Sequence, residues 1–175
     1  MRSPRPPTAE RAEHAERSDH AEPFEDFYAS HVDRVYRALA VALGDPDLAR
    51  EATDEAMLRA YARWSRVGAY DNPGGWVFRV GLNWATSWWR RVRGERPMAA
   101  HDIEVDPVDP PEAAAAGAAL ACLPLAQRAV VVCRVLLELS TSETAATLGV
   151  PEGTVKSRLA RALAGLRAAL AEEEQ

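Results

Sequence analysis

The segment from Leu139 to Leu166 constrains the fold of this chain more than any other part of the sequence. Ser140 and Glu143 have the spacing of a capping box, which starts a helix. Gly149 suits the left-handed end of that helix, and Pro151 suits the start of the next one. The pattern predicts two short helices joined by a glycine-containing turn, which is the arrangement of a helix-turn-helix.

The second helix of this pair has an apolar side and a side of small and cationic residues. The apolar residues recur at spacings of three and four and so share one side: Val155, Leu159, Ala162, Leu166 and Leu170. The other side carries Gly153, Ser157, Ala160, Arg161 and Ala164, flanked by Lys156. Such a surface suits entry into a DNA major groove with phosphate contacts on both sides. An ordinary helical hairpin with a solvated basic side is the alternative that spacing leaves open.

Composition limits how such a chain can bind DNA. Its 175 residues include 26 acidic and 21 basic ones, for a net charge of −5. Any DNA contact must therefore come from local basic patches rather than from overall attraction. The sequence has no run of about 18 apolar residues and no apolar signal-peptide core. These features predict a soluble, cytoplasmic protein without membrane insertion.

The sequence shows no chemistry of the kind that catalysis or metal binding requires. It contains no Gly-rich phosphate loop, no nucleophile elbow and no cluster with metal-ligand spacing. Cys122 and Cys133 stand eleven residues apart in apolar sequence, and both are expected to be buried thiols. We therefore predict a protein that is not an enzyme and that uses no cofactor or metal.

Three further helices are expected before the helix-turn-helix. The first begins at Phe24 and ends near Gly44, the second covers about 47–64, and the third covers about 75–93. A polar and cationic stripe on the third helix consists of Arg79, Asn83, Thr86, Arg90 and Arg93, and another side carries Trp76, Val77, Val80, Trp84 and Trp88. Cations beside aromatic rings suit single-stranded DNA, whereas a tryptophan core with a solvated arginine side remains the alternative.

Composition divides the chain into two small helical domains, so the expected fold class is all-α. Residues 1–22 form a charged, Pro-containing tail, and residues 23–96 form the first domain. Residues 97–118 form a flexible, Pro- and Ala-rich linker with five acidic residues and no Lys or Arg. Residues 119–175 form the second domain, in which apolar residues from Leu120 to Leu137 predict a helical segment beneath the helix-turn-helix. No appended C-terminal domain is expected, because no long segment follows residue 170.

Three sequence blocks resemble the extracytoplasmic-function sigma factors, the small two-domain class of the sigma-70 family. Residues 44–64, GDPDLAREATDEAMLRAYARW, are similar to the core-binding helix of region two. Residues 72–91, NPGGWVFRVGLNWATSWWRR, are similar to its promoter-melting and −10-reading segment. Residues 123–158, which end in GVPEGTVKSR, are similar to region four. The resemblance implies a region-two-like domain at 23–96 and a region-four-like domain at 119–175.

The resemblance also implies roles for individual residues. For −35 recognition they are Lys156, Ser157 and Ala160 facing bases and Thr154, Arg158 and Arg161 contacting phosphates. For −10 recognition and melting they are Asp71, Asn72, Trp76, Arg79, Asn83 and Arg90. For core-polymerase binding they are Glu51, Asp54, Glu55 and Leu58, with Asp54 departing from the usual family residue. The small Ala160 points to a contribution of DNA shape to −35 readout.

The function that the resemblance implies is promoter-specific transcription initiation as an RNA polymerase sigma factor. The implied partners are promoter DNA and core polymerase, contacted at the beta-prime clamp helices and the beta flap. For the class in general an anti-sigma factor is also implied, although no residue of this chain identifies one. The alternative is a helix-turn-helix regulator that binds DNA independently of polymerase, which would leave the first two blocks without a role.

Overall fold

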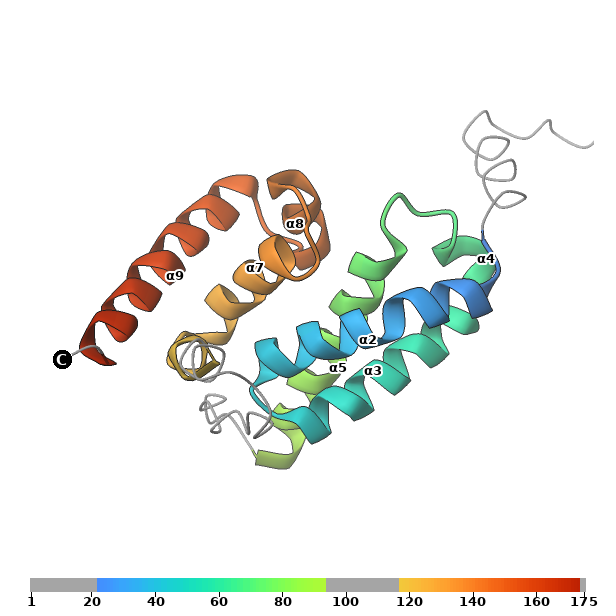
Figure 1. Cartoon of the computed structure of the whole chain (residues 1–175). Helices are drawn as coiled ribbons and strands as arrows, with labels where there is room; N and C mark the ends of the chain where they lie inside the picture. Colours follow the sequence, from blue (N-terminus) through green and yellow to red (C-terminus); the bar gives the residue numbers. More distant parts are fainter. Residues whose placement is uncertain (1–21, 94–116, 174–175) are drawn as a thin grey trace, which may run out of the picture.

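The computed structural model describes residues 22–93 and 117–173. Within these ranges the chain is helical and contains no strand, which confirms the predicted all-α class (Figure 1). The helices are α2 (Phe24–Leu43), α3 (Pro46–Tyr61), α4 (Trp64–Val67), α5 (Pro73–Arg93), α7 (Leu125–Val135), α8 (Thr141–Leu148) and α9 (Glu152–Glu173). We call α2–α5 the N-terminal module and α7–α9 the C-terminal module.

The N-terminal module is a bundle in which α3 packs against both α2 and α5. The turn between α2 and α3 lies where the sequence predicts it, and the Asp45 side chain accepts a hydrogen bond from the Leu48 amide at 2.9 Å, capping α3. Small residues are prominent in the core of this module, where six alanines of α2 and α3 are fully buried: Ala38, Ala42, Ala49, Ala52, Ala56 and Ala60. The second predicted helix, expected to reach Trp64, instead ends at Tyr61, and a separate short helix, α4, follows.

The C-terminal module contains the predicted helix-turn-helix in α8 and α9. Both hydrogen bonds of the Ser140–Glu143 capping box are present, and Gly149 has a φ of +66° in the turn. Below this pair, the largest fully buried side chain is that of Arg128 on α7. Its guanidinium donates to the carbonyl of Ala121 at 3.1 Å, and burial lowers its pKa. The arginine therefore ties α7 to the helical residues 117–121 that precede it.

Two expectations for the C-terminal module are wrong. The apolar segment from Leu120 to Leu137 is not one helix, because Pro124 separates residues 117–121 from α7. Cys122 lies at this break and is exposed, whereas Cys133 is buried within α7 as predicted. Leu170 shares the helical phase of the buried residues of α9 yet is 41% exposed. The apolar side of α9 therefore continues beyond the part of the helix that the core covers.

The two modules pack against each other. Helix α7 contacts α2, and α8 contacts α5. One cluster of buried side chains runs across the boundary and includes Val35 and Phe78 from the N-terminal module with Val132 and Leu137 from the C-terminal module. Most of the expected linker and nearly all of the expected N-terminal tail lie outside the described residues. The helical modules are thus in direct contact, which the sequence did not predict.

Candidate functional site

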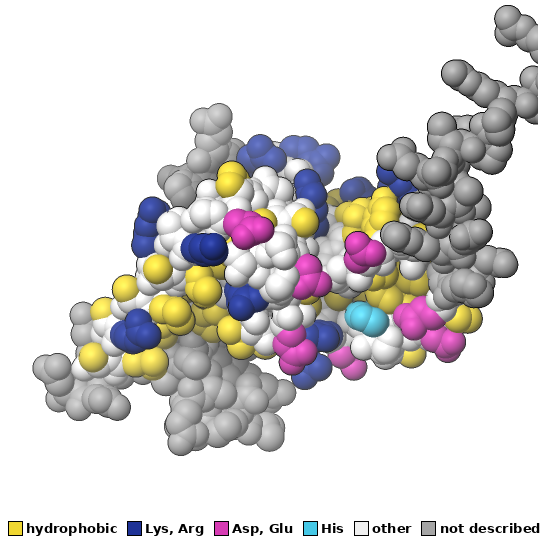
Figure 2. All heavy atoms as spheres, turned by 90° about the horizontal axis from the view of Figure 1, so that it is seen from above, with side chains coloured by type: hydrophobic (Ala, Val, Ile, Leu, Met, Phe, Trp, Pro, Cys, Tyr) yellow, Lys and Arg dark blue, Asp and Glu magenta, His cyan; other side chains and the backbone are white. Residues whose placement is uncertain are grey.

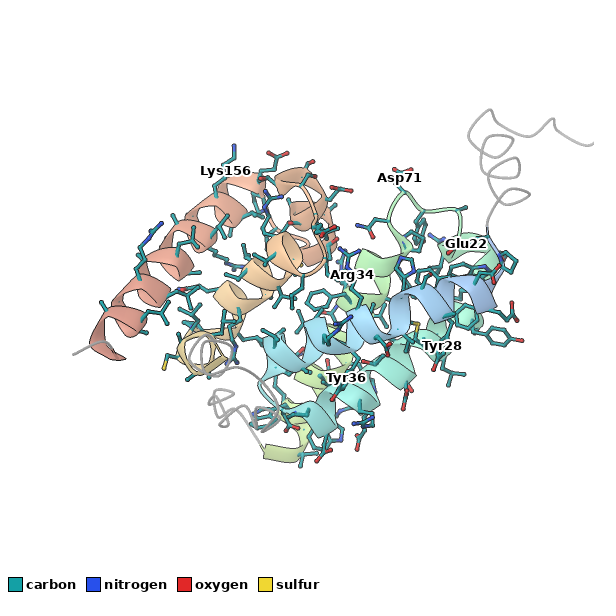
Figure 3. The ribbon with its side chains drawn as sticks, viewed as in Figure 1. Glu22, Tyr28, Arg34, Tyr36, Asp71 and Lys156 are labelled. Carbon is teal, nitrogen blue, oxygen red and sulfur yellow. The ribbon has the colours of Figure 1, made fainter. Side chains whose placement is uncertain are left out.

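The first turns of α9 present a row of exposed small and cationic residues. Lys156, Ala160 and Arg161 are exposed, and beyond the neighbouring residues and backbone of its own helix a Cβ built on Gly153 would meet no atom within 4 Å. On the opposite side of the helix, Val155 is 1% exposed. Lys156 points away from the protein at the end of α9 nearest α8 (Figure 3). The structure therefore brings the predicted cationic positions of this helix together on an accessible surface.

The remaining predicted residues of α9 lie at the edge of this surface. Thr154, Ser157 and Arg158 are half-buried. The Ser157 hydroxyl donates to the Thr154 carbonyl at 3.1 Å, which leaves its oxygen able to accept a hydrogen bond. Seen from above, Lys and Arg side chains lie over the half of the molecule that holds α9 and along the far edge, with Asp and Glu between them (Figure 2). The positive charge is therefore confined to local patches, as expected for a DNA-binding chain whose net charge is −5.

The loop before α5 carries two more predicted residues. Asp71 is exposed at the tip of this loop (Figure 3). The Asn72 side-chain oxygen accepts from the Gly75 amide at 2.7 Å and so satisfies a free N–H group in the first turn of α5. The Trp76 ring is half-buried and lies 6.5 Å from the Tyr70 ring, measured between centroids. Asn72 thus shapes the loop, while Asp71 and Trp76 border its surface.

The polar stripe of α5 lies on the outside of the bundle. Asn83 and Arg90 are exposed, and Arg90 hydrogen-bonds within its own helix, to the Thr86 carbonyl at 3.3 Å. Arg79 differs, because its guanidinium donates to the Ala146 carbonyl of α8 at 3.2 Å. The tryptophans divide as well: Trp84 and Trp88 are half-buried against the core. Trp89, which was not assigned to the apolar side, is only 6% exposed.

A cavity of about 240 Å³ lies between the loop and α8. It is lined by Asp71, Asn72, Trp76 and Arg79 from the N-terminal module and by Glu143, Ala146 and Thr147 from α8. Hydrogen bonds from the Ser140 side chain and backbone lower the pKa of Glu143, so this wall of the cavity carries a carboxylate. The sequence indicated the first four residues but gave no sign of the three on α8, because no local pattern reports a contact between modules.

A second exposed surface lies on α3. Glu51, Asp54 and Leu58 are exposed, Leu58 by 62%, and they recur at helical spacing. Glu55 is half-buried and pairs with Arg59 at 2.7 Å, so it is less available to a partner. Tyr61 is also 61% exposed and was missed by the sequence analysis, although its position three residues after Leu58 places it on the same side. The surface is therefore mixed, with acidic groups beside apolar ones.

The described parts of the chain hold no group of three or more His, Cys, Asp or Glu side chains able to bind a metal ion. Among the helices of residues 22–93 and 117–173, none is long and apolar enough to cross a membrane.

Comparison with known proteins identifies the family. The family model of sigma-70 region 4 matches residues 113–166. The RNA polymerase sigma-E factor of Streptomyces coelicolor is 35% identical over 149 residues, covering 82% of this chain and 84% of that protein. The ECF RNA polymerase sigma factor SigM of Mycobacterium tuberculosis is 33% identical, covering 82% and 74%.

A solved structure agrees with this in fold. The sigma factor RpoE of Bartonella quintana, crystallised with the anti-sigma factor NepR, matches with a TM-score of 0.70 and 20% identity, covering 84% of this chain and 96% of that one. The chain therefore belongs to the extracytoplasmic-function sigma factors of the sigma-70 family, which direct RNA polymerase to specific promoters.

Proposed function

We propose that this sigma factor reads promoters in two parts, with the C-terminal module on the −35 duplex and the N-terminal module on the melted −10 strand. The observation that carries the proposal is the exposed row of Lys156, Ala160 and Arg161 on the second helix of a capped helix-turn-helix. A recognition helix contacts base edges through its N-terminal residues, and these residues lie in the first three turns of α9.

The roles within this row follow from side-chain chemistry. Lys156 can donate to base-edge acceptors and the Ser157 oxygen can accept from a base-edge donor, whereas Ala160 leaves room for close approach to the groove floor. Thr154, Arg158 and Arg161 suit phosphates, which fix the register of the helix on the duplex. Since only two or three side chains address base edges, sequence-dependent DNA shape supplies part of the −35 specificity.

The N-terminal module is proposed to hold the non-template strand of the −10 element. Asp71, Asn72, Trp76 and Arg79 border a cavity beside an aromatic ring, which suits an unstacked base. Asn83 and Arg90 continue from it along the exposed side of α5, where a cationic group can neutralise the backbone of the strand.

Polymerase binding is proposed for the exposed side of α3, where Glu51, Asp54 and Leu58 face outward. A central apolar side chain with charged neighbours is the usual composition of a protein interface. The partner is the beta-prime clamp helices, and the beta flap contacts the C-terminal module. Each promoter contact is weak alone, and tethering both modules to polymerase raises their effective concentration at the promoter.

The proposed role requires no catalysis by the chain itself, and it places the protein with the polymerase in the cytoplasm. An anti-sigma factor is proposed as a further partner, because the related RpoE was crystallised with one.

Transcription with core polymerase on a promoter library tests the proposal. The wild-type chain should co-elute with core and select promoters with defined −35 and −10 elements. The double substitution Lys156→Ala and Arg161→Ala should abolish −35-dependent transcription and leave co-elution unchanged. Arg167→Ala controls for the loss of a positive charge elsewhere on the same helix, because Arg167 is an exposed cation further along α9. Tight binding to duplex DNA without any binding to core would instead favour a polymerase-independent regulator.

A further inference from the structure

The segment from Arg59 to Tyr70, which joins α3 to the loop before α5, carries cations and aromatic rings but no acidic residue. Its sequence is RAYARWSRVGAY, with three arginines and three aromatic residues. The promoter contacts proposed above leave this segment without a role. Aromatic rings interleaved with cations are typical of surfaces that bind single-stranded nucleic acid, because bases stack on the rings and the phosphates need neutralising.

One side of α4 is fixed against α2. The Trp64 indole donates to the Glu22 carbonyl at 2.8 Å. Its ring packs on the rings of Phe24 and Phe27 of α2, with centroids 5.3 Å and 4.7 Å away. Val67, three residues later on the same side of α4, is buried in the core. These contacts hold α4 in one orientation and leave its other side facing solvent.

The solvent side of α4 carries Arg63 and Arg66, which are both exposed. The Arg63 carbonyl accepts from the Arg66 amide at 2.9 Å, so the two side chains leave the same side of this helical turn. Arg59 differs from them, because it pairs with Glu55 at 2.7 Å. Among the residues that the structure describes, no carboxylate pairs with Arg63 or Arg66. The positive charge of these two arginines is thus available to a partner.

Tyr70 connects these arginines to the cavity that is proposed to take a base of the −10 strand. Its amide donates to the Val67 carbonyl at 3.1 Å in the turn that follows α4. Its ring lies 6.5 Å from the ring of Trp76, which lines the cavity. The chain from Arg66 to Asp71, which also lines the cavity, can span at most about 18 Å. A strand with a spacing of about 3.4 Å per nucleotide covers that distance with roughly five nucleotides.

The position of α4 in the molecule indicates which part of the promoter strand it can reach. Helix α9, which is proposed to bind the −35 element, lies at one end of the molecule, and α4 lies at the other end (Figure 1). The cavity lies between them, because it is lined by the loop after α4 and by α8. Since the −35 element is upstream of the −10 element, a strand that leaves the cavity toward α4 runs downstream, toward the transcription start site.

We propose that Tyr70, Arg66 and Arg63 bind the non-template strand immediately downstream of the −10 element. The inference rests on the proposed function of the cavity and adds a segment of DNA that neither the −10 nor the −35 contact covers. The two arginines neutralise phosphates, and the Tyr70 ring offers a surface on which the next base can stack. Such contacts accept any base, so they raise affinity for the melted strand without adding sequence specificity.

Three fluorescein-labelled DNA probes, made from a promoter recovered in the library transcription, test the proposal by anisotropy with holoenzyme. The first probe is a duplex that contains the −35 element and ends before the −10 element. The second adds the −10 element as a single non-template strand, and the third extends that strand downstream by about six nucleotides. Wild-type holoenzyme should bind the third probe about tenfold more tightly than the second, because stacking and two phosphate contacts are added. The slope of log affinity against log salt should be steeper by about 1.4, since each phosphate contributes about 0.7.

The double substitution Arg63→Ala and Arg66→Ala should reduce the tenfold gain to less than about threefold and should restore the salt slope of the second probe. Binding of the second probe and co-elution with core should stay near wild type. The matched control is Arg37→Ala with Arg50→Ala, which removes two exposed cations from the same module. Arg50 lies over the Tyr36 ring, 5.2 Å from its centroid, and Tyr36 is far from Asp71 (Figure 3). The control should keep the full gain.

A gain that persists without Arg63 and Arg66 would overturn the proposal, because polymerase itself would then hold the extension. The proposal also fails if the double substitution weakens the second and third probes equally, or if the control loses the gain as well. Wild-type holoenzyme that prefers the second probe to the first but gains nothing from the third contradicts this proposal alone. No preference for the second probe over the first refutes the proposed function of the cavity, and the present proposal with it.

Discussion

Gly149 shows how a single residue links the turn of the helix-turn-helix to the contact between modules. Its φ of +66° is unfavourable for any residue with a Cβ. A Cβ at this position would also lie 3.2 Å from the Arg79 guanidinium, which itself holds α8. Gly153, four residues later, is helical, and a Cβ there would meet nothing within 4 Å beyond its own helix. Position 149 therefore requires glycine, whereas position 153 can accept a side chain.

Alanine at each of these glycines should change stability in opposite directions. Gly149→Ala should lower the free energy of unfolding by about 1–2 kcal/mol, because alanine must adopt the left-handed conformation. Gly153→Ala should raise it by about 0.5–1 kcal/mol, because alanine loses less conformational entropy in a helix. Urea denaturation followed by circular dichroism measures both. A stabilising Gly149→Ala would contradict the turn geometry.

Charge reversal at Arg90 and at Arg91 distinguishes a specific contact with the −10 strand from a general effect of positive charge. Both are exposed on α5, but only Arg90 belongs to the polar stripe. Arg90→Glu should reduce open-complex formation by roughly tenfold, because a charge-assisted contact worth about 1.5 kcal/mol is lost. Permanganate reactivity of promoter thymines measures this. Arg91→Glu has the same charge change and should have a much smaller effect, whereas equal losses would indicate bulk electrostatics.

At the scale of the element, local signals account for where the helices of the C-terminal module begin and end. The capping box starts α8, Gly149 ends it, and α9 follows Pro151, all as the sequence predicts. The break at Pro124 was not predicted, because apolar residues continue on both sides of the proline. Capping residues, glycine and proline thus predict where these helices begin and end, whereas apolar periodicity does not.

The capping box gives α8 a pH dependence that can be measured. Hydrogen bonds from Ser140 hold the pKa of Glu143 below its ordinary value of 4.5. A carboxyl whose pKa is lowered by folding stabilises the native state above that ordinary value, and the stabilisation is lost as pH falls through the lowered pKa. Glu143→Gln should therefore be less stable than wild type at pH 7, and the difference should shrink below about pH 4.5. Thermal unfolding between pH 3 and pH 7 measures it, and a difference that persists at low pH would rule out this carboxylate as its source.

For the whole molecule, the continuous core predicts that the two modules unfold together. All five tryptophans lie in the N-terminal module, so their fluorescence reports on that module, whereas circular dichroism reports on every helix. Val131 belongs to a separate small cluster with Leu123 and Ala162 in the C-terminal module. A destabilising change there should affect the tryptophan signal only through the interface.

Val131→Ala provides this test. The substitution should lower the free energy of unfolding by about 1–3 kcal/mol, from lost apolar burial and the cavity left behind. The tryptophan and dichroism transitions should shift together in urea. In the Arg34→Ala background, where the interface is weakened by loss of the ion pair between Arg34 and Glu138 of the other module, the tryptophan transition should stay near its wild-type midpoint. A fluorescence transition unaffected by Val131→Ala alone would show that the modules unfold independently.

The sequence by itself determined the helices, their caps and the side of α9 that carries Lys156 and Arg161, because these depend on neighbours within a few residues. The resemblance to the family named Glu51, Asp54 and Leu58, and their helical spacing puts them on one side of α3. Only the tertiary structure decided that α8 packs against α5, and that Arg34 pairs with a carboxylate more than a hundred positions away. Periodicity shows that a side chain is buried but not what buries it, and that choice depends on how surfaces distant in sequence fit together.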